Sequence, residues 1–446
     1  MSNLEVMNQL KYKENIQKLF IQLEERLIER EQLVRLIVLA LFSKNHMFLI
    51  GSRGVAKSGA IRLINDVFSD TKQVWQLQGS SSTKKENFFG KEYFNENSQI
   101  SLNANGTLLD AHVGIIDEMF KIPGEILNSL LEVLVDRYYT IGDGKIHKTD
   151  LISVFAASNE YPVERFMEPY VDRFLFWCEV EKIKSSKNRE KYYAGHFTKE
   201  PIIEKYFKLA DLEHINESAT RVIFPKELVS LYTLITEQFI ESGIKTSDRK
   251  YGEIVKVFKV SAYLNARTSI NYSDLFLLRY TAWHNDIEQD KVKKHLHDAV
   301  FYSKEEIKKM VSDLYNLHEE QKTYEKNSLY DVLRYKKEFK GLSASENFEF
   351  LRSEAKVLLG NYEYLENKIR DIILIYERNK QILQELKENI FIVGVEYNSF
   401  SQETIDEVLK LHKTVKDDVY YLNEWLNKNT SLFDYSGNVH KAKDLQ

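Results

Sequence analysis

One loop in the N-terminal part of the chain combines glycines, a lysine and a hydroxyl group, the residue types that bind phosphate. The loop consists of Gly51, Ser52, Arg53, Gly54, Val55, Ala56, Lys57 and Ser58. It follows the apolar stretch Met47–Ile50 and precedes the helical run Gly59–Phe68, which is the strand, loop and helix order of a P-loop. Backbone N–H groups of such a loop surround phosphates at a helix N-terminus, while Lys57 would reach the β- and γ-phosphates and Ser58 would bind magnesium.

The loop departs from the P-loop pattern at one position. The pattern has glycine immediately before the lysine, whereas this sequence has Ala56. The alternative is a glycine-rich turn that binds nothing, but that interpretation leaves the acidic and polar strand ends farther along the chain unexplained. We therefore predict that residues 51–58 bind ATP together with Mg²⁺.

A pair of carboxylates follows a second apolar stretch. Asp117 and Glu118 come directly after Val113–Ile116. Successive side chains of a strand point in opposite directions, so one carboxylate could bind magnesium while the other orients the attacking water. Acidic pairs are also common in loops that cap helices. Behind a P-loop at this distance, however, the pair is typical of a Walker B motif.

Two further polar residues lie next to predicted strands. Asn159 comes after Leu151–Ala156, where its amide could position the water or contact the γ-phosphate, and a simple asparagine turn is the alternative. Arg173 precedes the apolar stretch Leu175–Val180, and a ring ATPase would insert such an arginine into the site of the neighbouring subunit. The alternative for Arg173 is a salt bridge with a nearby carboxylate. Arg165 is the second candidate for an inserted arginine.

A third arginine stands near the start of a long predicted helix. Ser247 or Asp248 is expected to cap this helix, which would place Arg249 in its first turn. A cation in the first turn opposes the helix dipole unless an anion such as a phosphate compensates it. Arg249 is therefore a candidate nucleotide sensor, and the alternative is an ordinary solvent-facing arginine.

Cysteine and histidine provide no further site. Cys178 has no histidine close to it in sequence, and we predict that it is buried and inert. The 11 histidines show no metal-ligand spacing, and no Ser/His/Asp set is visible.

The elements that must position these residues change in kind along the chain. From about residue 35 to residue 180, short apolar stretches alternate with amphipathic runs, which is typical of a parallel α/β sheet. Polar and glycine-containing stretches predict one hairpin between Phe89 and His112 and a second between Tyr138 and Thr149. All five prolines lie at or before Pro225, and Pro225–Asn285 has the pattern of a compact group of helices, a lid.

The C-terminal region has two apolar stripes with coiled-coil spacing. The first stripe consists of Tyr362, Leu365, Ile369, Ile372, Tyr376, Asn379, Leu383, Leu386 and Ile390. The second consists of Ile405, Val408, His412, Val415, Val419, Leu422 and Leu426. The two stripes predict an antiparallel helical hairpin joined through residues 390–402, in which the polar Asn379 and His412 fix the register or lie at the solvated edge. We therefore expect a nucleotide-binding α/β domain over 1–185, a helical lid over 186–288, and a helical bundle containing the hairpin over 289–446.

Bulk composition excludes several other classes of protein. A chain of 446 residues with 43% hydrophobic and 29% charged residues is expected to fold into more than one domain. Its net charge of −5 disfavours non-specific nucleic-acid binding, which depends on many cationic contacts. A single cysteine, a polar start and apolar runs much shorter than a membrane span lead us to expect a cytoplasmic protein without a transmembrane segment.

The order of these motifs resembles that of the MoxR-type AAA+ ATPases. The shared motifs are Gly51–Ser58, Asp117-Glu118, Ala157-Ser158-Asn159-Glu160, Asp172-Arg173-Phe174 and Ser247-Asp248-Arg249. That family commonly has alanine before the loop lysine, as at Ala56. Lys121–Leu131 and Ser247–Lys250 resemble the RavA branch in particular. The resemblance covers about residues 10–285.

The resemblance implies a role for each motif residue and a fold for the whole chain. The implied roles are phosphate and magnesium binding by Lys57 and Ser58, magnesium binding by Asp117, water activation by Glu118, and the parts of sensor one, arginine finger and sensor two by Asn159, Arg173 and Arg249. The implied fold is an AAA+ core, a parallel sheet flanked by helices, followed by an all-α lid and here by a C-terminal helical bundle.

RavA-like proteins interrupt their helical bundle with a small β-containing domain. In this chain only Phe391–Tyr397 has the composition of a strand there, so we expect that domain to be absent or reduced. Family members typically form hexamers, pair with a von Willebrand factor A-domain protein and act as chaperone-like remodelers of protein complexes. The expected function is therefore an ATP-driven remodeler; the alternatives are a nucleotide-gated scaffold with negligible turnover and a DNA-linked motor.

Overall fold

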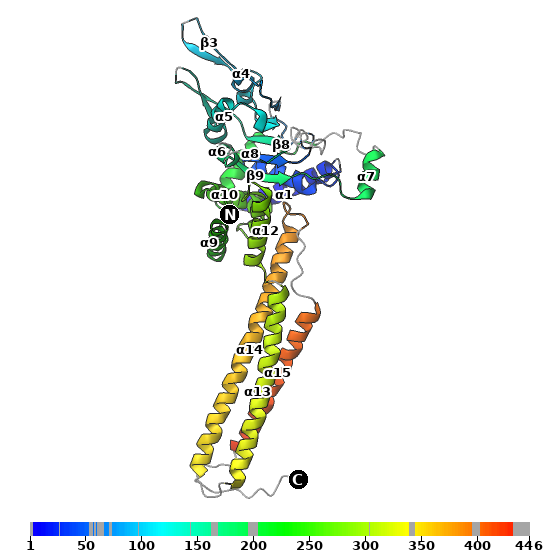
Figure 1. The fold of residues 1–446 in the computed structure, drawn as a ribbon, viewed down its shortest axis with the longest axis vertical. Coiled ribbons are helices and arrows are strands. Elements are labelled where there is room, and N and C mark those ends of the chain that lie inside the picture. The colour runs from blue at the N-terminus through cyan, green and yellow to red at the C-terminus, as the bar shows by residue number, and fades with distance from the viewer. Residues whose placement is uncertain are drawn as a thin grey trace. The chain divides into compact units, whose positions relative to one another are not determined.

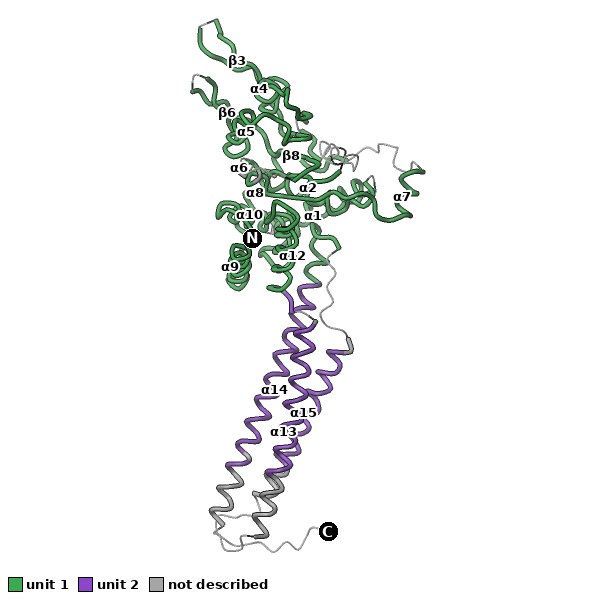
Figure 2. The backbone as a smooth tube through the Cα atoms, in the orientation of Figure 1, with its two compact units in different colours: residues 1–300, 384–395 green, residues 301–383, 396–446 purple. Residues whose placement is uncertain are grey.

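The computed structural model describes residues 3–25, 27–52, 57, 59, 67–70, 74–96, 98–142, 144–161, 168–194, 204–302, 304–338, 344–394 and 402–430. The chain divides into two compact units (Figure 2). Unit 1 comprises residues 1–300 and 384–395, and unit 2 comprises residues 301–383 and 396–446. The expected boundary at residues 288 and 289 is therefore corrected, because residues 289–300 and a short segment near residue 390 belong to unit 1.

A five-stranded sheet forms the centre of unit 1 (Figure 1). Its strands, in spatial order, are β2 (Trp75–Gln78), β5 (Val113–Asp117), β8 (Ser153–Ser158), β1 (His46–Ile50) and β9 (Phe174–Glu179). Every neighbouring pair is parallel, which confirms the predicted parallel α/β fold. All residues of β1 and β8 are buried, as expected for strands covered on both faces.

The strand register brings separate sequence motifs to one edge of the sheet. Ile50, the last residue of β1, pairs with Ser158 on one side and with Glu179 on the other, and Asp117 pairs with Ala157. The carboxyl ends of β1, β5, β8 and β9 therefore lie side by side. The loop that contains Lys57 starts at this edge, and the acidic pair lies there too.

Helices cover the sheet and continue into the lid. Those of the α/β part are α1 (Asn3–Glu24), α2 (Glu31–Phe42), α4 (Lys85–Phe89), α5 (Gly124–Asp136), α6 (Glu168–Val171) and α7 (Ser186–Tyr193), with 3-10 turns η2 (Leu108–Asp110) and η3 (Met119–Lys121). Those of the lid region are α8 (Leu209–Ala219), α9 (Lys226–Glu241), α10 (Asp248–Leu264), α11 (Tyr272–Leu275), η5 (Phe276–Tyr280) and α12 (Asp286–Val300). The predicted helical lid after Pro225 is thus present. Its α10 is capped by Ser247, whose hydroxyl accepts from the Lys250 N–H at 3.2 Å.

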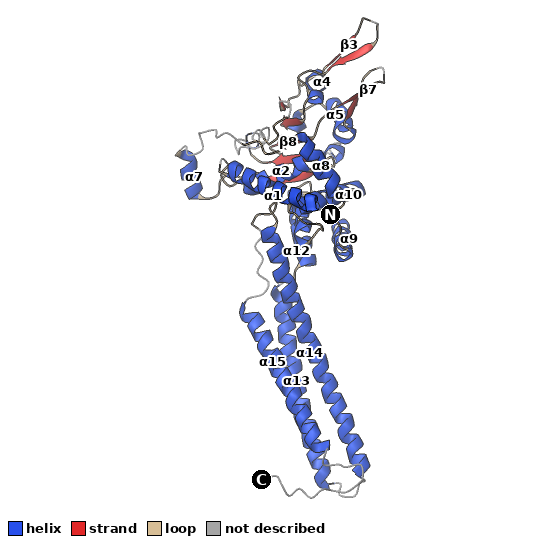
Figure 3. Cartoon of the chain, turned by 180° about the vertical axis from the view of Figure 1, so that it is seen from behind, coloured by secondary structure: helices blue, strands red, loops and turns tan. Residues whose placement is uncertain are grey.

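Both predicted hairpins are present. Strands β3 (Lys91–Phe94) and β4 (Ile100–Asn103) pair antiparallel, as do β6 (Tyr138–Thr140) and β7 (Ile146–Lys148). The hairpins lie at the same end of unit 1, near α4 and α5 (Figures 1 and 3). They also touch, because the N–H of Gly142 donates to Oε2 of Glu92 at 3.2 Å.

Unit 2 contains three long helices, the two of the predicted antiparallel hairpin and one more. They are α13 (Lys304–Glu338), α14 (Ala344–Glu388) and α15 (Gln402–Thr430), and in Figures 1 and 3 α14 runs antiparallel to the other two. One apolar cluster joins all three helices, so the two predicted stripes pack around a third, from α13, that the prediction omitted. Leu411 rather than His412 fills the cluster, and His412 lies beside Glu366 at 3.8 Å. Phe391–Gly394 form no strand, and residues 395–397 lie outside the described residues.

Long helices do not imply membrane insertion here. The apolar residues of α14 form a stripe rather than a continuous belt, and no helix within the described ranges is both long and apolar enough to cross a bilayer.

The stability of the lid depends on a fully buried carboxylate. Asp274 accepts from both terminal nitrogens of Arg267 at 2.7 and 2.8 Å and from the Ser261 hydroxyl at 2.8 Å. Asp274→Ala leaves Arg267 without this partner and should lower the free energy of unfolding by about 3–5 kcal/mol. Urea unfolding followed by circular dichroism measures the change. The control Asp290→Ala, at an 83% exposed side chain, should stay within about 0.5 kcal/mol of wild type; equal losses in both variants would contradict the prediction.

Candidate functional site

Lys57 is held where two strands end. Its Nζ is buried and donates to the carbonyl oxygens of Gly51, Ser52 (3.4 Å) and Ser158 (3.3 Å), and to Oδ1 of Asn159 at 3.0 Å. The amine therefore stands at the carboxyl ends of β1 and β8. Of the predicted loop, Gly51, Ser52 and Lys57 are described. The other predicted loop residues, Arg53, Gly54, Val55, Ala56 and Ser58, lie outside the described residues.

Glu118 does not continue strand β5. Its backbone is left-handed (φ 53°, ψ 46°), and its N–H donates to Oδ1 of Asp117 at 3.0 Å. The simple alternation of side chains expected along a strand therefore stops at Asp117, and the turn decides where the Glu118 carboxylate lies. Its Oε1 accepts from the Asn159 amide at 2.6 Å, and its Oε2 lies 3.3 Å from Nζ of Lys121.

Asn159 connects the cation of the site with its carboxylate. Its amide oxygen accepts from Lys57 and its amide nitrogen donates to Glu118, so the side chain is fixed at both ends. The structure thus brings together three residues that lie far apart in the sequence. The result is a buried ammonium group and an oriented carboxylate separated by one amide.

These residues fit a magnesium nucleotide. Lys57 is surrounded by oxygen acceptors, which phosphate oxygens can replace. Mg²⁺ is usually bound by one or two carboxylates together with substrate phosphates and water, and Asp117 ends β5 at this edge. The arrangement can therefore bind a polyphosphate and hold a carboxylate beside it.

A glycine that sequence reasoning missed allows the acidic turn to form. The N–H of Gly79 donates to the carbonyl oxygen of Asp117 at 2.7 Å, and a Cβ on Gly79 would lie 2.5 Å from the carbonyl oxygen of Glu118. Only glycine fits this approach of the β2 end to the turn. The strand that precedes Gly79, β2, was not predicted, so the sequence did not distinguish this glycine from one in an ordinary loop.

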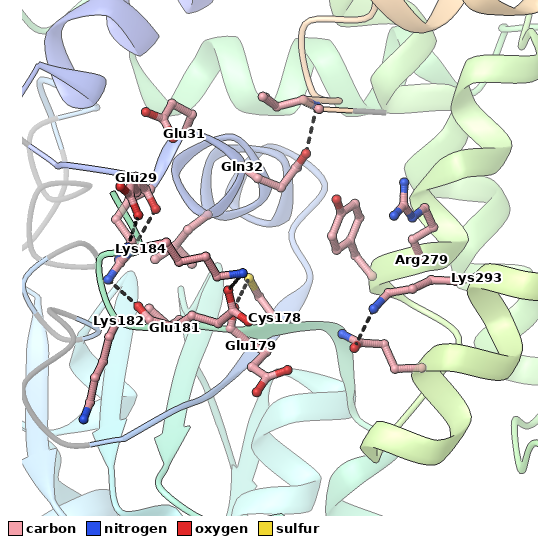
Figure 4. A pocket seen from close by; sticks show the side chains of 17 residues that line it. Glu29, Glu31, Gln32, Cys178, Glu179, Glu181, Lys182, Lys184, Arg279 and Lys293 are labelled. Atoms are coloured by element: carbon pink, nitrogen blue, oxygen red, sulfur yellow. Dashed lines mark hydrogen bonds and ion pairs between the residues drawn. The ribbon is translucent and has the colours of Figure 1, made fainter. Parts of the chain in front are cut away.

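A cavity of ≈ 500 Å³ lies in unit 1 beside the loop (Figure 4). It is lined by Glu29–Leu33, Cys178–Lys182, Lys184, Arg279, Tyr280, Gln289, Lys293, Val393 and Gly394. Val180 donates its N–H to the carbonyl oxygen of Ile50 at 2.7 Å, and a Cβ on Gly51 would lie 2.4 Å from the Val180 oxygen. Gly51, the first residue of the loop, therefore packs directly against a residue of the cavity wall. Cys178 is buried as predicted, and burial raises the pKa of its thiol to about 12.

Arg173 lies at the opposite edge of the sheet. It precedes Phe174, which pairs with His46 at the start of β1, whereas Lys57 lies beyond the end of β1. Five residues of strand separate the two edges by about 17 Å, which exceeds the reach of an arginine side chain. Nη1 of Arg173 donates to Asp172 at 2.8 Å, so the salt bridge considered as an alternative is present.

Arg249 lies at the same edge of the sheet as Arg173, away from Lys57. Ser247 donates its hydroxyl to both carboxylate oxygens of Asp172 at 3.1 and 3.2 Å, which fixes the start of α10 beside Asp172. Arg249, in the first turn of α10, is exposed. The structure therefore does not bring Arg249 to the loop of its own chain. Arg165 lies outside the described residues.

A buried lysine that the sequence did not reveal ties the lid to β9. Lys250 is 2% exposed, and its Nζ lies 2.7 Å from Nε2 of His284 and donates to the carbonyl oxygen of Phe174 at 3.4 Å. Nδ1 of His284 lies 3.5 Å from Glu288. Burial lowers the pKa of Lys250 to about 7, and burial followed by the Lys250 charge lowers that of His284 to about 4. Lysine in a first helical turn gives no sequence signal of burial.

The fold and the site together define a class of protein. A parallel sheet with a loop lysine, an acidic turn and an asparagine at one edge, followed by a helical lid, is the architecture of the AAA+ P-loop proteins. Residues 14–217 match the family described as the MoxR domain in the MoxR-vWA-beta-propeller ternary systems, and residues 226–296 match the AAA lid domain. Residues 14–296 are therefore similar to a MoxR-type AAA+ domain followed by an AAA lid.

Known proteins resemble the chain over different lengths. An uncharacterized protein of Methanocaldococcus jannaschii is 26% identical over 402 residues, covering 88% of this chain and 98% of that protein. Chaperone MoxR1 of Mycobacterium tuberculosis is 24% identical over 209 residues, covering 46% of this chain and 54% of MoxR1. The crystal structure of a proposed ATPase from Cytophaga hutchinsonii has a TM-score of 0.52 at 16% identity, covering 65% of this chain and 96% of that one, which supports the fold.

The buried Lys250 should make stability depend on pH. In the unfolded chain its pKa is near 10.5, so above about pH 7 the unfolded state binds more protons and stability rises with pH. Lys250→Met should therefore show a shallower rise in unfolding free energy between about pH 7 and about pH 8.5, measured by urea unfolding. The control Lys256→Met, at a 69% exposed side chain, should keep the wild-type slope. Identical slopes for wild type and Lys250→Met would refute the assignment.

Proposed function

We propose that the chain is an Mg²⁺-dependent ATPase that assembles as a ring of identical subunits and remodels a partner protein. The observation that carries the proposal is the hydrogen-bonded series Lys57, Asn159 and Glu118 at one edge of the sheet, with Arg173 at the other. The first edge has the groups for binding and attack. The second edge has the Arg173 guanidinium, which cannot reach the phosphate site of its own subunit.

Each group at the first edge has a distinct task. The Lys57 side chain binds the β- and γ-phosphates, and Ser58 and Asp117 would hold Mg²⁺, which would neutralise further phosphate charge. Glu118 accepts a proton from the attacking water, and its carboxylate is oriented for this by Asn159. Asn159 also accepts a hydrogen bond from Lys57, so a displacement of the amine by phosphate moves Asn159 and, through it, the Glu118 carboxylate.

The cavity beside Gly51 is the proposed site for the base and ribose. Its volume of ≈ 500 Å³ lies within the usual range for small-molecule pockets. Core residues such as Val180 and lid residues such as Arg279 and Tyr280 both line it. A nucleotide bound there would contact the core and the lid together.

The ring follows from where the arginines lie. Arg173 and the exposed Arg249 occupy the edge away from Lys57, held there by Asp172 and Ser247. A guanidinium at this edge can meet phosphate only in another subunit, as in a head-to-tail ring. We propose a hexamer, in which Arg173 is the arginine finger and Arg249 the second sensor, both acting on the neighbouring site.

The partner is proposed from the two hairpins and the matched family. Large apolar side chains are exposed on both hairpins, with Phe94 at 74%, Tyr93 at 51% and Ile146 at 59%. Exposed apolar groups gathered at one end of a unit are suited to hold an unfolded or partly folded segment. The matched MoxR domain is described in systems with a vWA protein, so we propose a von Willebrand factor A-domain partner, and the Ser247–Lys250 motif supports the RavA branch.

Mixed subunits test the ring. Rings of Glu118→Gln alone or of Arg173→Ala alone should lose at least about 10³-fold in steady-state phosphate release, because each lacks one half of every site. An equal mixture should regain about a quarter of wild-type activity, since a quarter of the interfaces pair an intact Glu118 with an intact Arg173. The control Arg189→Ala, at an exposed position of α7, should remain fully active.

Two results of this experiment would reject parts of the proposal. Mixed rings as inactive as the single variants would show that Arg173 does not act between subunits. Wild-type protein that binds ATP but releases no phosphate, with or without a vWA partner, would favour the nucleotide-gated scaffold instead.

Removing the central amide tests its positioning role. Asn159→Ala should lower turnover by about 10²-fold or more, because Glu118 loses the donor that orients it, while ATP affinity should change less because Lys57 remains. Phosphate release and nucleotide titration measure the two quantities. Asn105→Ala, at an exposed loop position, is the matched control. Turnover equal to wild type would rule out a role for Asn159.

A further inference from the structure

A short segment after α14 returns to unit 1 and packs against the α/β part. We call Asn389–Gly394 the return segment. The Gln32 side chain donates to the carbonyl oxygen of Phe391 and accepts from the N–H of Val393, both at 2.9 Å. Arg35 donates to the carbonyl oxygen of Ile390 at 3.1 Å. Two side chains of α2 therefore fix three backbone groups of the return segment.

The same segment is bonded to the lid. The Asn389 side chain is 2% exposed, donates to the Ser273 hydroxyl at 2.9 Å and accepts from Nδ2 of Asn265 at 3.1 Å. Asn265 in turn accepts from the N–H of Ile390 at 3.0 Å. Buried amides that are paired on every side hold one conformation, because a shift would leave polar groups unsatisfied. The return segment is thus rigidly placed between α2 and the lid.

The return segment also forms part of the cavity wall. Val393 and Gly394 line the cavity that borders Gly51, and Figure 4 shows Gln32 hydrogen-bonded to this segment beside the pocket. The other lining residues come from the segment before α2, the first turn of α2 itself, the end of β9 and the residues after it, η5 and α12. One wall of the cavity therefore comes from a part of the chain more than 350 residues away from Gln32 in sequence, with a separation of 359 to Phe391.

We propose that the return segment is part of the base and ribose site, with Val393 and Gly394 contacting the bound nucleoside. The inference rests on the proposed function, which places phosphate at Lys57 and Gly51 and the nucleoside in the adjoining cavity. Gln32 also lines the cavity, and we assign it a positioning role because its side chain holds the backbone of Phe391 and Val393 through two hydrogen bonds. The segment is the direct continuation of α14, so nucleotide binding holds the end of that helix in place.

A triphosphate without a base distinguishes binding at the return segment from binding at the phosphate site. Inorganic tripolyphosphate with Mg²⁺ can occupy the loop but leaves the cavity unfilled. ATP with Mg²⁺ occupies both. Any property of the return segment that responds to ATP and not to tripolyphosphate therefore reports contact with the nucleoside.

Alkylation of an introduced thiol measures that contact. Val393→Cys is close to isosteric, and its thiol should react with a maleimide at least about tenfold more slowly with saturating ATP and Mg²⁺, with no protection by tripolyphosphate. Val229→Cys, at a 41% exposed position of α9 outside the cavity, should react equally under all conditions. The native Cys178 is buried with a raised pKa and provides the same slow background in both variants.

Loosening the wall gives a second, independent measurement. Gln32→Ala should weaken ATP binding by about tenfold while leaving tripolyphosphate affinity unchanged, because only the nucleoside meets the return segment. Gln17→Ala, at an exposed position of α1, should keep wild-type affinity for both ligands.

The outcomes distinguish this inference from the function on which it rests. Wild-type protein that fails to bind ATP overturns the proposed function and the inference with it. Wild-type protein that binds ATP, while the Val393→Cys thiol is unprotected and Gln32→Ala binds normally, overturns the inference alone. Protection by tripolyphosphate equal to that by ATP also overturns it, because the wall would then respond to phosphate and not to the nucleoside.

Discussion

Parallel pairing of β1 with β8 and β9 is the constraint on which the site depends. Parallel strands point the same way, so each residue that follows a strand reaches the same edge of the sheet, and each residue that precedes one reaches the other. Lys57 and Asn159 follow β1 and β8, whereas Arg173 precedes β9. Lys57 and Asn159 are therefore separated from Arg173 by the length of a strand, which is why the proposed function takes Arg173 from a second copy of the chain.

Buried polar contacts hold the lid in register with this sheet. The Lys250 side-chain nitrogen and the Ser247 hydroxyl connect the start of α10 to Phe174 and Asp172, at the same edge as Arg173. Asp274, with Arg267 and Asn389, connects the other end of the lid to the return segment. The lid thus has polar attachments at both ends, and a movement of the lid must break or carry along groups that are costly to leave unpaired.

The sequence predicted β1, β5, β8 and β9 and the polar residues at their ends, because these features are local, whereas it did not predict β2. A buried parallel strand is a continuous apolar run, and Asp117 and Asn159 stand directly behind such runs. What it could not predict depends on long-range contacts. The left-handed turn at Glu118, the approach of Gly79 and the burial of Lys250 are decided by segments distant in the chain. The third helix of unit 2 was missed because its apolar stripe is interrupted by polar residues such as His318 and Gln321, both buried in the structure.

The discontinuity of unit 1 has a consequence for how the protein is made. The polypeptide leaves unit 1 after residue 300 and supplies its last piece at residues 384–395. A nascent chain emerging from the ribosome therefore lacks one side of the α2 and lid contacts until the 124 residues from Asn265 to Asn389 have been added. Until then the Asn265 and Gln32 groups that bind the return segment can be hydrated only by water. Docking of the return segment then joins residues that are very far apart in sequence, and contacts of this kind form slowly during folding.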